Sequence, residues 1–260
     1  MKRLHITAEG QTEESFVNKT LKQYLARFDV FADVRCVLTG KKGNRLFRGG
    51  MTDYAKAKND ISRWLKEEQN NKDVVFTTMF DFYALPDDFP GLKEASQKAD
   101  PYEKVALIEE AFYKDINDTR FIPYIQLHEF EALLFVNPQM FEKEFFEEPD
   151  GIKELQSIRD KFVNPELIDN GPETAPSKRI INIYPRYGES KPTIGSMIAH
   201  EIGIDDLKKS CRHFNDWITR LETIATQTPP STRHTDRPAP TRCSGKRRRI
   251  PCGANRQRRS

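Results

Sequence analysis

Residues 4–13 read LHITAEGQTE, and this stretch decides the fold that we predict. Its first five residues are apolar or β-favouring and predict a short buried strand. Gly10 allows a tight or left-handed turn, and Thr12 suits the N-cap of a helix whose first turn holds Glu13. This order places Glu9 at the carboxyl edge of an α/β sheet, where such sheets bind ligands. The alternative is that Glu9 is an ordinary polar turn residue.

Two later stretches repeat the arrangement of a strand followed by an acid. Residues 74–80 (VVFTTMF) form a continuous apolar run, typical of a central parallel strand, and end in Asp81. The alternative for Asp81 is a turn or a helix cap. Residues 121–127 predict a further strand, which is followed by Glu129 and Glu131. These two glutamates share one face if the chain is extended and diverge if it is helical.

Helical periodicity fills most of the remaining chain. A second strand is expected at 31–39, and apolar residues at helical spacing predict helices at 12–28, 54–65, 101–117, 135–146, 152–162, 177–184, 195–203, 205–211 and 213–221. We therefore predict an α/β domain over residues 1–222. It has a mainly parallel sheet, helices on both faces and a helical subregion at about 136–222.

Charge divides the chain near residue 223. Residues 223–260 contain ten Lys or Arg and one acid, whereas residues 1–222 contain 32 basic and 38 acidic residues, a net charge of −6. The C-terminal segment has no aromatic residue and cannot bury enough apolar surface to offset its ordering entropy. We predict a disordered basic tail that offers Arg and Lys to nucleic-acid phosphates. A read-through segment that is not native is the alternative.

Composition also sets the expected compartment. The sequence has no run of eighteen apolar residues, and its first residues lack the features of a signal peptide. The four cysteines are too scattered for a disulfide framework or a CxxC zinc site, so we read Cys211, and His213 beside it, as packing or capping residues. We expect a cytoplasmic protein that does not enter membranes.

A glycine-rich basic segment follows the second predicted strand. Its basic side chains are those of Lys41, Lys42, Arg45 and Arg48, on what we predict to be a mobile loop. Such side chains bind phosphate backbones, so we treat the four as candidate nucleic-acid-binding residues. The alternative is a solvated hairpin.

The strand-end acids predict a cation. Glu9 and Asp81, with Glu129 or Glu131, repel one another unless a cation lies between them. Oxygen ligands without thiolates select Mg²⁺ or Mn²⁺ rather than zinc. Such an ion polarises a phosphoryl oxygen and activates water, which is the chemistry of phosphodiester cleavage. The sequence contains no GxxxxGK[ST] phosphate-binding loop.

The same residues carry a resemblance to a known family. EGQTE at 9–13 resembles the first Toprim motif, and Asp81 stands where Toprim domains carry Asp-x-Asp. The ordered blocks EGQTEESF, DFYALP, HEFEALLF, PSKRI and HFNDWITRLE resemble a family of small bacterial Toprim-like proteins, the domain of unknown function 4276 family. These proteins are similar to the nuclease half of OLD-family nucleases, which implies a Toprim-like fold, phage defence and an ATPase partner.

The resemblance also implies roles for single residues. Glu9 matches the Toprim glutamate, which binds metal or acts as a general base, and Asp81 matches the first acid of Asp-x-Asp. Tyr83 replaces the second acid, which departs from the family pattern. OLD-type nucleases use a lysine near the end of the domain to stabilise the transition state, and the candidates are Lys178 and Lys191.

Two functions follow from these predictions. The first is a Mg²⁺- or Mn²⁺-dependent nuclease that cleaves DNA or RNA. The second is a non-catalytic Toprim-like module that docks on an ATPase and uses its acidic pocket for binding or sensing.

Overall fold

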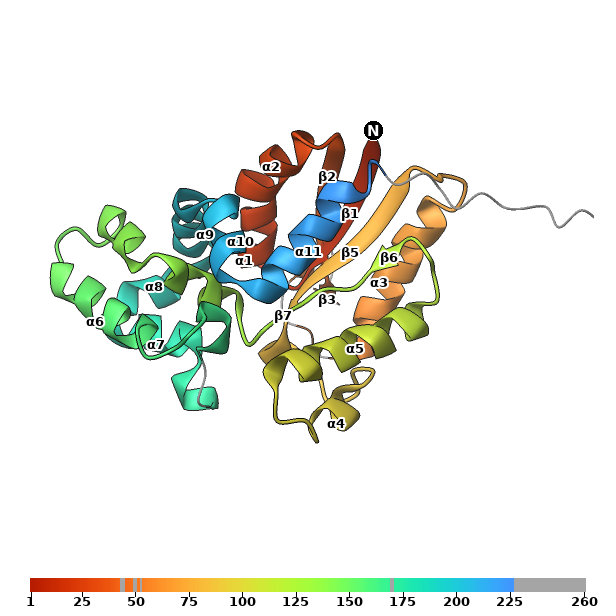
Figure 1. Cartoon of the computed structure of the whole chain (residues 1–260). Helices are drawn as coiled ribbons and strands as arrows, with labels where there is room; N and C mark the ends of the chain where they lie inside the picture. Colours follow the sequence, from red (N-terminus) through yellow and green to blue (C-terminus); the bar gives the residue numbers. More distant parts are fainter. Residues whose placement is uncertain (43–44, 49–50, 52, 169–170, 227–260) are drawn as a thin grey trace, which may run out of the picture. The chain divides into compact units, whose positions relative to one another are not determined.

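The computed structural model describes residues 1–226 except 43–44, 49–50, 52 and 169–170, and it gives only the backbone of 38–42, 45–48 and 172 (Figure 1). The main sheet has five strands, and every pairing between them is parallel. Four strands lie in the order β2 (Val30–Cys36), β1 (Lys2–Ala8), β5 (Val74–Asp81) and β6 (Phe121–Ile122), and β7 (Ile125–Gln126) also pairs with β5. The prediction of an α/β fold on a mainly parallel sheet is confirmed.

The path of the chain through this sheet reverses at β1. From β1 the chain moves to β2 on one side, and it then crosses back to β5 on the other side. In the register of the sheet, Ala8 pairs with both Cys36 and Met79. The carboxyl ends of β1 and β5 therefore meet at a topological switch point, where open α/β sheets form their ligand crevice.

Helices cover both faces of the sheet, as predicted (Figure 1). Alternate side chains of a strand point to opposite faces, so β5 contributes to two apolar cores, and β1 contributes Leu4 and Ile6 to one of them. One core joins Leu4 and Met79 to the N-terminal helical segment and to α11 (Arg212–Thr223). The other joins Phe76 and its neighbours on β5 to α3 (Tyr54–Glu67) and α5 (Pro101–Ile116).

The N-terminal helix differs from the prediction at its start. Its N-cap is Gly10 rather than Thr12, and Gly10 has extended backbone (φ −146°), so no left-handed turn is needed. The carboxylate of Glu13 accepts the Gly10 amide at 2.9 Å and completes the cap. The helix runs as α1 (Gln11–Phe16), a π-helical turn η1 (Val17–Leu21) and α2 (Lys22–Ala26).

The basic segment forms a hairpin rather than the predicted loop. The strand expected at 31–39 ends at Cys36, and β3 (Leu38–Lys42) then pairs antiparallel with β4 (Arg45–Arg48). In the shape of its backbone the segment agrees with the alternative, a hairpin. The side chains of Lys41, Lys42, Arg45 and Arg48 lie outside what the structure describes, so their contact with nucleic acid stays a prediction.

The region after β5 mixes short helices with the two short strands. Instead of one strand over 121–127, the chain forms β6 and β7 on either side of Pro123. Instead of an α-helix over 135–146, it forms two 3-10 helices. The short elements of this region are η2 (Phe82–Ala84), α4 (Leu92–Ala95), η3 (Phe130–Val136) and η4 (Pro138–Lys143).

The C-terminal subregion is helical, as predicted. It contains α6 (Pro149–Arg159), η5 (Pro165–Leu167), η6 (Pro172–Thr174), α7 (Pro176–Ile183), α8 (Pro185–Glu189), α9 (Lys191–Ile202) and α10 (Ile204–Ser210), followed by α11. Five of these elements begin on a proline, which suits a first helical position because the residue there needs no amide donor.

All the described residues belong to one unit, Met1–Gln227. The predicted tail falls almost entirely on residues 227–260, which lie outside the described residues, so its disorder and its origin stay predictions. Across the described part of the chain, no helix has both the length and the apolar character that crossing a bilayer requires.

Candidate active site

The carboxyl ends of β1 and β5 bring Glu9 and Asp81 together. The Glu9 amide donates to the carbonyl oxygen of Met79 at 3.0 Å, which extends the parallel ladder by one residue. The Oε2 atom of Glu9 then accepts the amide of Asp81 at 3.0 Å. These two acids, 72 residues apart in the chain, are therefore neighbours at the switch point of the sheet.

Glu13 is a third acid at this point, and the sequence analysis did not assign it to the site. It lies one turn into α1 and is buried, with 5% of its surface exposed. Its Oε2 atom accepts the Gly10 amide, which holds the side chain over the turn that follows Glu9. An acid four residues after a strand-end glutamate was the available signal, but the helix dipole already accounts for an acid in a first turn.

Glu131 reaches the same cluster from η3, and Glu129 lies close enough for its charge to act on Glu9 and Glu131 while its carboxylate binds the start of α7. Glu131 is almost fully buried, and its Oε1 atom accepts the Tyr187 hydroxyl at 3.1 Å and lies 3.0 Å from the Lys191 ammonium. Glu129 is the residue before η3, and its Oε2 atom accepts the amide of Ser177 at 2.8 Å. The two glutamates thus diverge, as expected for a helical start.

Burial and mutual repulsion raise the pKa values of the clustered acids. Burial raises the pKa of Glu9 to about 7, against a favourable hydrogen bond from Asp81 and with the charge of Glu131 adding to the rise. Burial and the charge of Glu9 raise the pKa of Glu13 to about 8. Burial, with the charges of Glu13 and Glu9, raises the pKa of Asp81 well above its usual value. Without a cation, these carboxylates cannot all be ionised at neutral pH.

Asp81 carries an open acceptor atom. Its Oδ1 atom is buried, and it has no hydrogen-bond partner among the described residues. A buried carboxylate oxygen normally has a partner, so this atom is a position where a ligand or a cation fits. Within the described part of the chain, no three His, Cys, Asp and Glu side chains are already arranged as a metal cage. Mg²⁺ does not require such a cage, because it commonly binds one or two carboxylates and completes its shell with water and substrate phosphate.

The structure separates the two candidate lysines. Lys191, the first residue of α9, forms the ion pair with Glu131, and its side chain is 34% exposed. Burial lowers the pKa of Lys191, but the charges of Glu131, Glu129 and Asp81 raise it overall, so Lys191 is a cation beside the acids. Lys178 lies in the first turn of α7 with an exposed side chain. Of the two, Lys191 is therefore the lysine that contacts the cluster.

Tyr187 and Gly195 support Glu131, and the sequence analysis identified neither as part of the site. Tyr187 is fully buried in α8, and its hydroxyl donates to Glu131. Gly195 lies on α9, where a Cβ atom would come within 2.8 Å of the Tyr187 hydroxyl oxygen. The absence of a side chain at residue 195 thus leaves room for the hydroxyl. Tyr187 stands between Arg186 and Gly188 in the sequence, and nothing there ties it to Glu131, so no signal marked this role.

A family model described as Domain of unknown function (DUF4276) matches residues 8–222, which is most of the chain. The chain belongs to the DUF4276 family. Comparison with curated proteins gives no match, and comparison with solved structures gives none either. The matched range covers Glu9, Asp81, Glu131 and Lys191.

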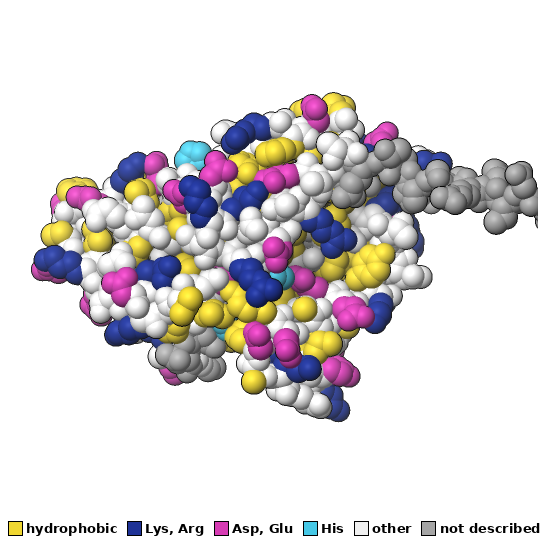
Figure 2. Space-filling view, viewed as in Figure 1, with side chains coloured by type: hydrophobic (Ala, Val, Ile, Leu, Met, Phe, Trp, Pro, Cys, Tyr) yellow, Lys and Arg dark blue, Asp and Glu magenta, His cyan; other side chains and the backbone are white. Residues whose placement is uncertain are grey.

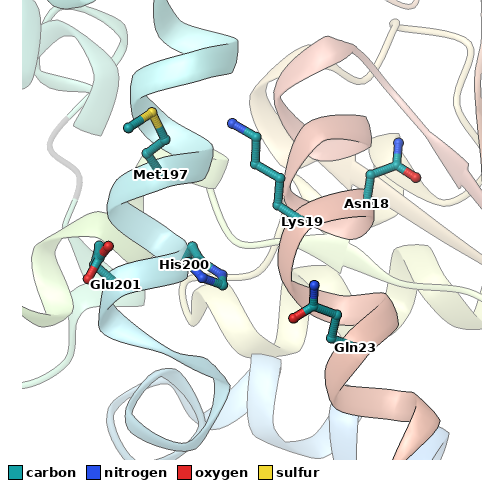
Figure 3. Close-up of a pocket in the computed structure, with 6 residues that line it drawn as sticks. All are labelled: Asn18, Lys19, Gln23, Met197, His200 and Glu201. Carbon is teal, nitrogen blue, oxygen red and sulfur yellow. The ribbon is translucent and has the colours of Figure 1, made fainter.

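The DUF4276 domain has another hollow, away from the paired acids at the strand ends. This groove, of about 600 Å³, lies between the N-terminal helical segment and α9. Figure 3 shows Lys19 and Gln23 on one wall and His200 and Met197 on the other. His200 Nδ1 lies 3.1 Å from the Thr20 hydroxyl, so its ring links the two helices. The groove brings no pair of acids together, and it is not the predicted site.

Cys211 and His213 pack within the DUF4276 domain, as predicted. Cys211 is fully buried and is the residue before α11. The ring of His213 stacks on Tyr124 at a centroid distance of 5.1 Å. Its Nε2 atom lies 3.0 Å from Oε1 of Glu109. These contacts describe a structural histidine rather than a metal ligand.

Proposed function

We propose that this protein is a Mg²⁺- or Mn²⁺-dependent phosphodiesterase that cleaves DNA or RNA. The observation that carries the proposal is the pairing of Glu9 with Asp81 at the switch point, together with the open Oδ1 atom of Asp81. A divalent ion held by these acids supplies charge to a phosphoryl oxygen and lowers the pKa of bound water.

The side chains of the cluster suit the other parts of such a reaction. Glu9 has a pKa of about 7 without a cation, and in this proposal it either holds the ion beside Asp81 or acts as the general base that takes a proton from water. Lys191 carries positive charge next to Glu131 and interacts with the charges of Glu9 and Asp81. We assign Lys191 to stabilising the negative charge that develops on the phosphate.

The relation to Toprim domains and to OLD-family nucleases is part of the same proposal. It rests on the EGQTE motif and on the acid at the end of β5, and it brings with it a role in phage defence beside an ATPase. Figure 2 shows Lys and Arg interspersed with Asp and Glu on the viewed face. Because cations and acids are mixed on this face, we propose that the strand is bound by a few local cations, those of Lys41, Lys42, Arg45 and Arg48.

Two observations favour a second candidate function. Tyr83 stands where Toprim domains carry a second acid, and within the described residues no ready three-donor metal group exists. A non-catalytic partner of an ATPase, which binds a ligand at the acids without cleaving it, agrees with both points.

Cleavage assays test the proposal. Circular single-stranded DNA, plasmid DNA and RNA are incubated with wild type, Glu9→Ala and Asp81→Ala, with Mg²⁺, Mn²⁺ or EDTA. We expect cleavage by wild type only with a divalent ion, and a loss on the order of 100-fold in each variant. Asp87→Ala is the matched control, because Asp87 is an exposed acid in the loop that follows Asp81.

Thermal melting with and without Mg²⁺ provides a readout that does not depend on activity. A ligand that binds the folded state raises the melting temperature, so Mg²⁺ is expected to stabilise wild type and Asp87→Ala but not Asp81→Ala. Equal cleavage by all four proteins, or an equal Mg²⁺ effect on all of them, excludes the proposed metal site. A Mg²⁺ effect without cleavage favours the non-catalytic partner.

A further inference from the structure

A small pocket lies beside the acid cluster and belongs to none of the roles assigned so far. Its volume is about 230 Å³. Three elements build it: the chain just after β5, the end of the segment that contains β7, and the first turns of α5. The side chains that matter here are those of Phe82, Tyr83, Lys104, Leu127 and His128.

The pocket and the acids share the same two chain segments. Phe82 directly follows Asp81, and His128 directly precedes Glu129. The Tyr83 amide donates to the carbonyl oxygen of His128 at 3.1 Å, which joins the two segments. The pocket and the acids are therefore built from adjacent residues of the same two segments.

The walls of the pocket are aromatic and apolar. The rings of Tyr83 and His128 are 5.2 Å apart between centroids, and the Phe82 ring meets that of His128 edge to face at 6.4 Å. Leu127 and Val105 are buried and supply apolar surface. Flat aromatic faces with apolar neighbours are the surfaces on which proteins stack unpaired nucleobases.

His128 adopts a backbone conformation that is uncommon for residues other than glycine. Its φ is +60°, in the left-handed region, although it is neither glycine nor exposed. Such conformations cost free energy and concentrate at binding sites, where the surrounding structure enforces them. Here the conformation places the His128 ring against Tyr83 and Phe82.

Lys104 adds a cation to the pocket. It lies in the first turn of α5, and its side chain is half-buried. Among the described residues its ammonium group has no ion pair and no hydrogen bond, so it is available for a phosphate. An aromatic pocket with one free cation matches the two parts of a nucleotide, its base and its phosphate.

We propose that this pocket binds the base of an unpaired nucleotide in a single strand whose backbone passes over the acid cluster. The inference rests on the proposed nuclease function and names its substrate as single-stranded nucleic acid. The volume is below the roughly 300–1,000 Å³ of sites for drug-sized ligands and suits one ring system rather than a base pair.

Binding is measured without divalent ions, so that the result does not depend on cleavage. Fluorescence anisotropy in EDTA compares a labelled single-stranded 12-mer, the same strand with abasic sites, a blunt duplex, and competition by AMP. We expect the single strand to bind wild type at least 5-fold more tightly than the abasic strand and the duplex. Both DNA strands carry the same phosphates, so this difference reports the base.

Variants locate that binding. Tyr83→Ala is expected to weaken binding of the intact strand by roughly 5- to 100-fold, whereas Tyr83→Phe, which retains the ring, stays near wild type. Lys104→Gln is expected to weaken the intact and abasic strands alike. The controls are Tyr113→Ala and Lys66→Ala, which change an exposed tyrosine on α5 and an exposed lysine on α3.

Four results overturn the inference. The first three are equal binding of intact and abasic strands, no loss of binding in both Tyr83→Ala and Lys104→Gln, and no binding of any strand. The fourth is competition by AMP as strong as by the unlabelled strand, which would assign the pocket to a free nucleotide. If Tyr83→Ala does not fold, the comparison of intact and abasic strands on wild type still shows whether the protein binds the base. Base-dependent binding without metal-dependent cleavage supports this pocket and rejects the nuclease.

Discussion

Glu131 is held by two neighbours, the Tyr187 hydroxyl and the Lys191 ammonium. A buried carboxylate is stable only when such partners satisfy it, because its desolvation is otherwise unfavourable. The position of Tyr187 depends in turn on Gly195, where a Cβ atom would lie 2.8 Å from the hydroxyl oxygen. The hydrogen bond to Glu131 thus depends on the space that Gly195, which has no side chain, leaves for the Tyr187 hydroxyl.

Gly195→Ala is expected to lower the free energy of unfolding by about 1–3 kcal/mol, because the new methyl group displaces the Tyr187 hydroxyl from Glu131. Chemical denaturation measures this change. Gly188→Ala is the matched control, since a Cβ there meets Ile181 at an ordinary 3.6 Å. An equal stability change in both variants contradicts the role given to Gly195.

Single residues differ in how well the sequence revealed them. Glu9 and Asp81 could be predicted, since each ends a strand and the carboxyl ends of parallel strands meet at one edge. Tyr187 could not, because its partner Glu131 lies 56 residues away in the chain. Glu13 could not, because the helix dipole already accounts for an acid in a first turn. The predicted N-cap at Thr12 was wrong because Glu13 caps the Gly10 amide from within the helix. The metal and catalytic roles of all these residues stay predictions.

The start of α11 shows how one acid fixes an element. Glu166 belongs to η5 and is fully buried. Its carboxylate accepts the amides of His213 at 2.9 Å and Phe214 at 2.8 Å, and the Tyr102 hydroxyl lies 3.3 Å from it. The first amides of a helix have no partner within the helix, so Glu166 serves as a cap supplied from 47 residues away.

Removing this cap is expected to destabilise the domain. Glu166→Ala leaves two amides at the start of α11 without their acceptor and should lower the free energy of unfolding by roughly 2–4 kcal/mol. Thermal or chemical denaturation measures the change, with Glu147→Ala as the control at an exposed glutamate. If Glu166→Ala and Glu147→Ala lose the same amount of stability, the carboxylate of Glu166 does not stabilise α11.

Elements with a strong pattern were predicted, and elements set by tertiary contacts were not. The apolar run of β5 and the amphipathic spacing of α3 identified both elements correctly. Residues 130–136 form a 3-10 helix in which six consecutive side chains are buried, so no amphipathic pattern marks them. The hairpin depends on pairing between β3 and β4. The glycines of this segment are typical of a loop, so the sequence did not indicate the pairing.

At the scale of the molecule, the reversal of strand order at β1 gathers the acids. The alternation of strands and helices predicted a parallel sheet, but the order β2-β1-β5-β6 is not visible in the sequence. That order makes β1 and β5 neighbours and brings Glu9, Glu13, Asp81 and Glu131 into one region with raised pKa values. The gathered charge affects the stability of the whole domain.

Stability should therefore fall as the pH rises. The pKa of Glu9 is about 7 and that of Glu13 about 8 in the folded protein, against 4.5 for each in the unfolded chain. Between pH 4.5 and 8 the folded state binds more protons than the unfolded state, so the free energy of unfolding decreases with pH in this window. Below pH 4.5 both states are protonated at these groups, and above pH 8 both are ionised.

Glu13→Gln tests this dependence, because glutamine keeps an acceptor for the Gly10 amide and carries no charge. Without divalent ions, we expect the variant to gain about 1–3 kcal/mol over wild type between pH 5 and pH 8.5, a relative rise of roughly 3–10 °C in melting temperature. Melting curves across this range measure it, with Glu154→Gln, an exposed glutamate of α6, as the control. The opposite slope, or parallel curves for wild type and Glu13→Gln, means that Glu13 is already ionised in the folded protein without a cation. The crowded carboxylates would then give no reason to expect a metal at the end of β1.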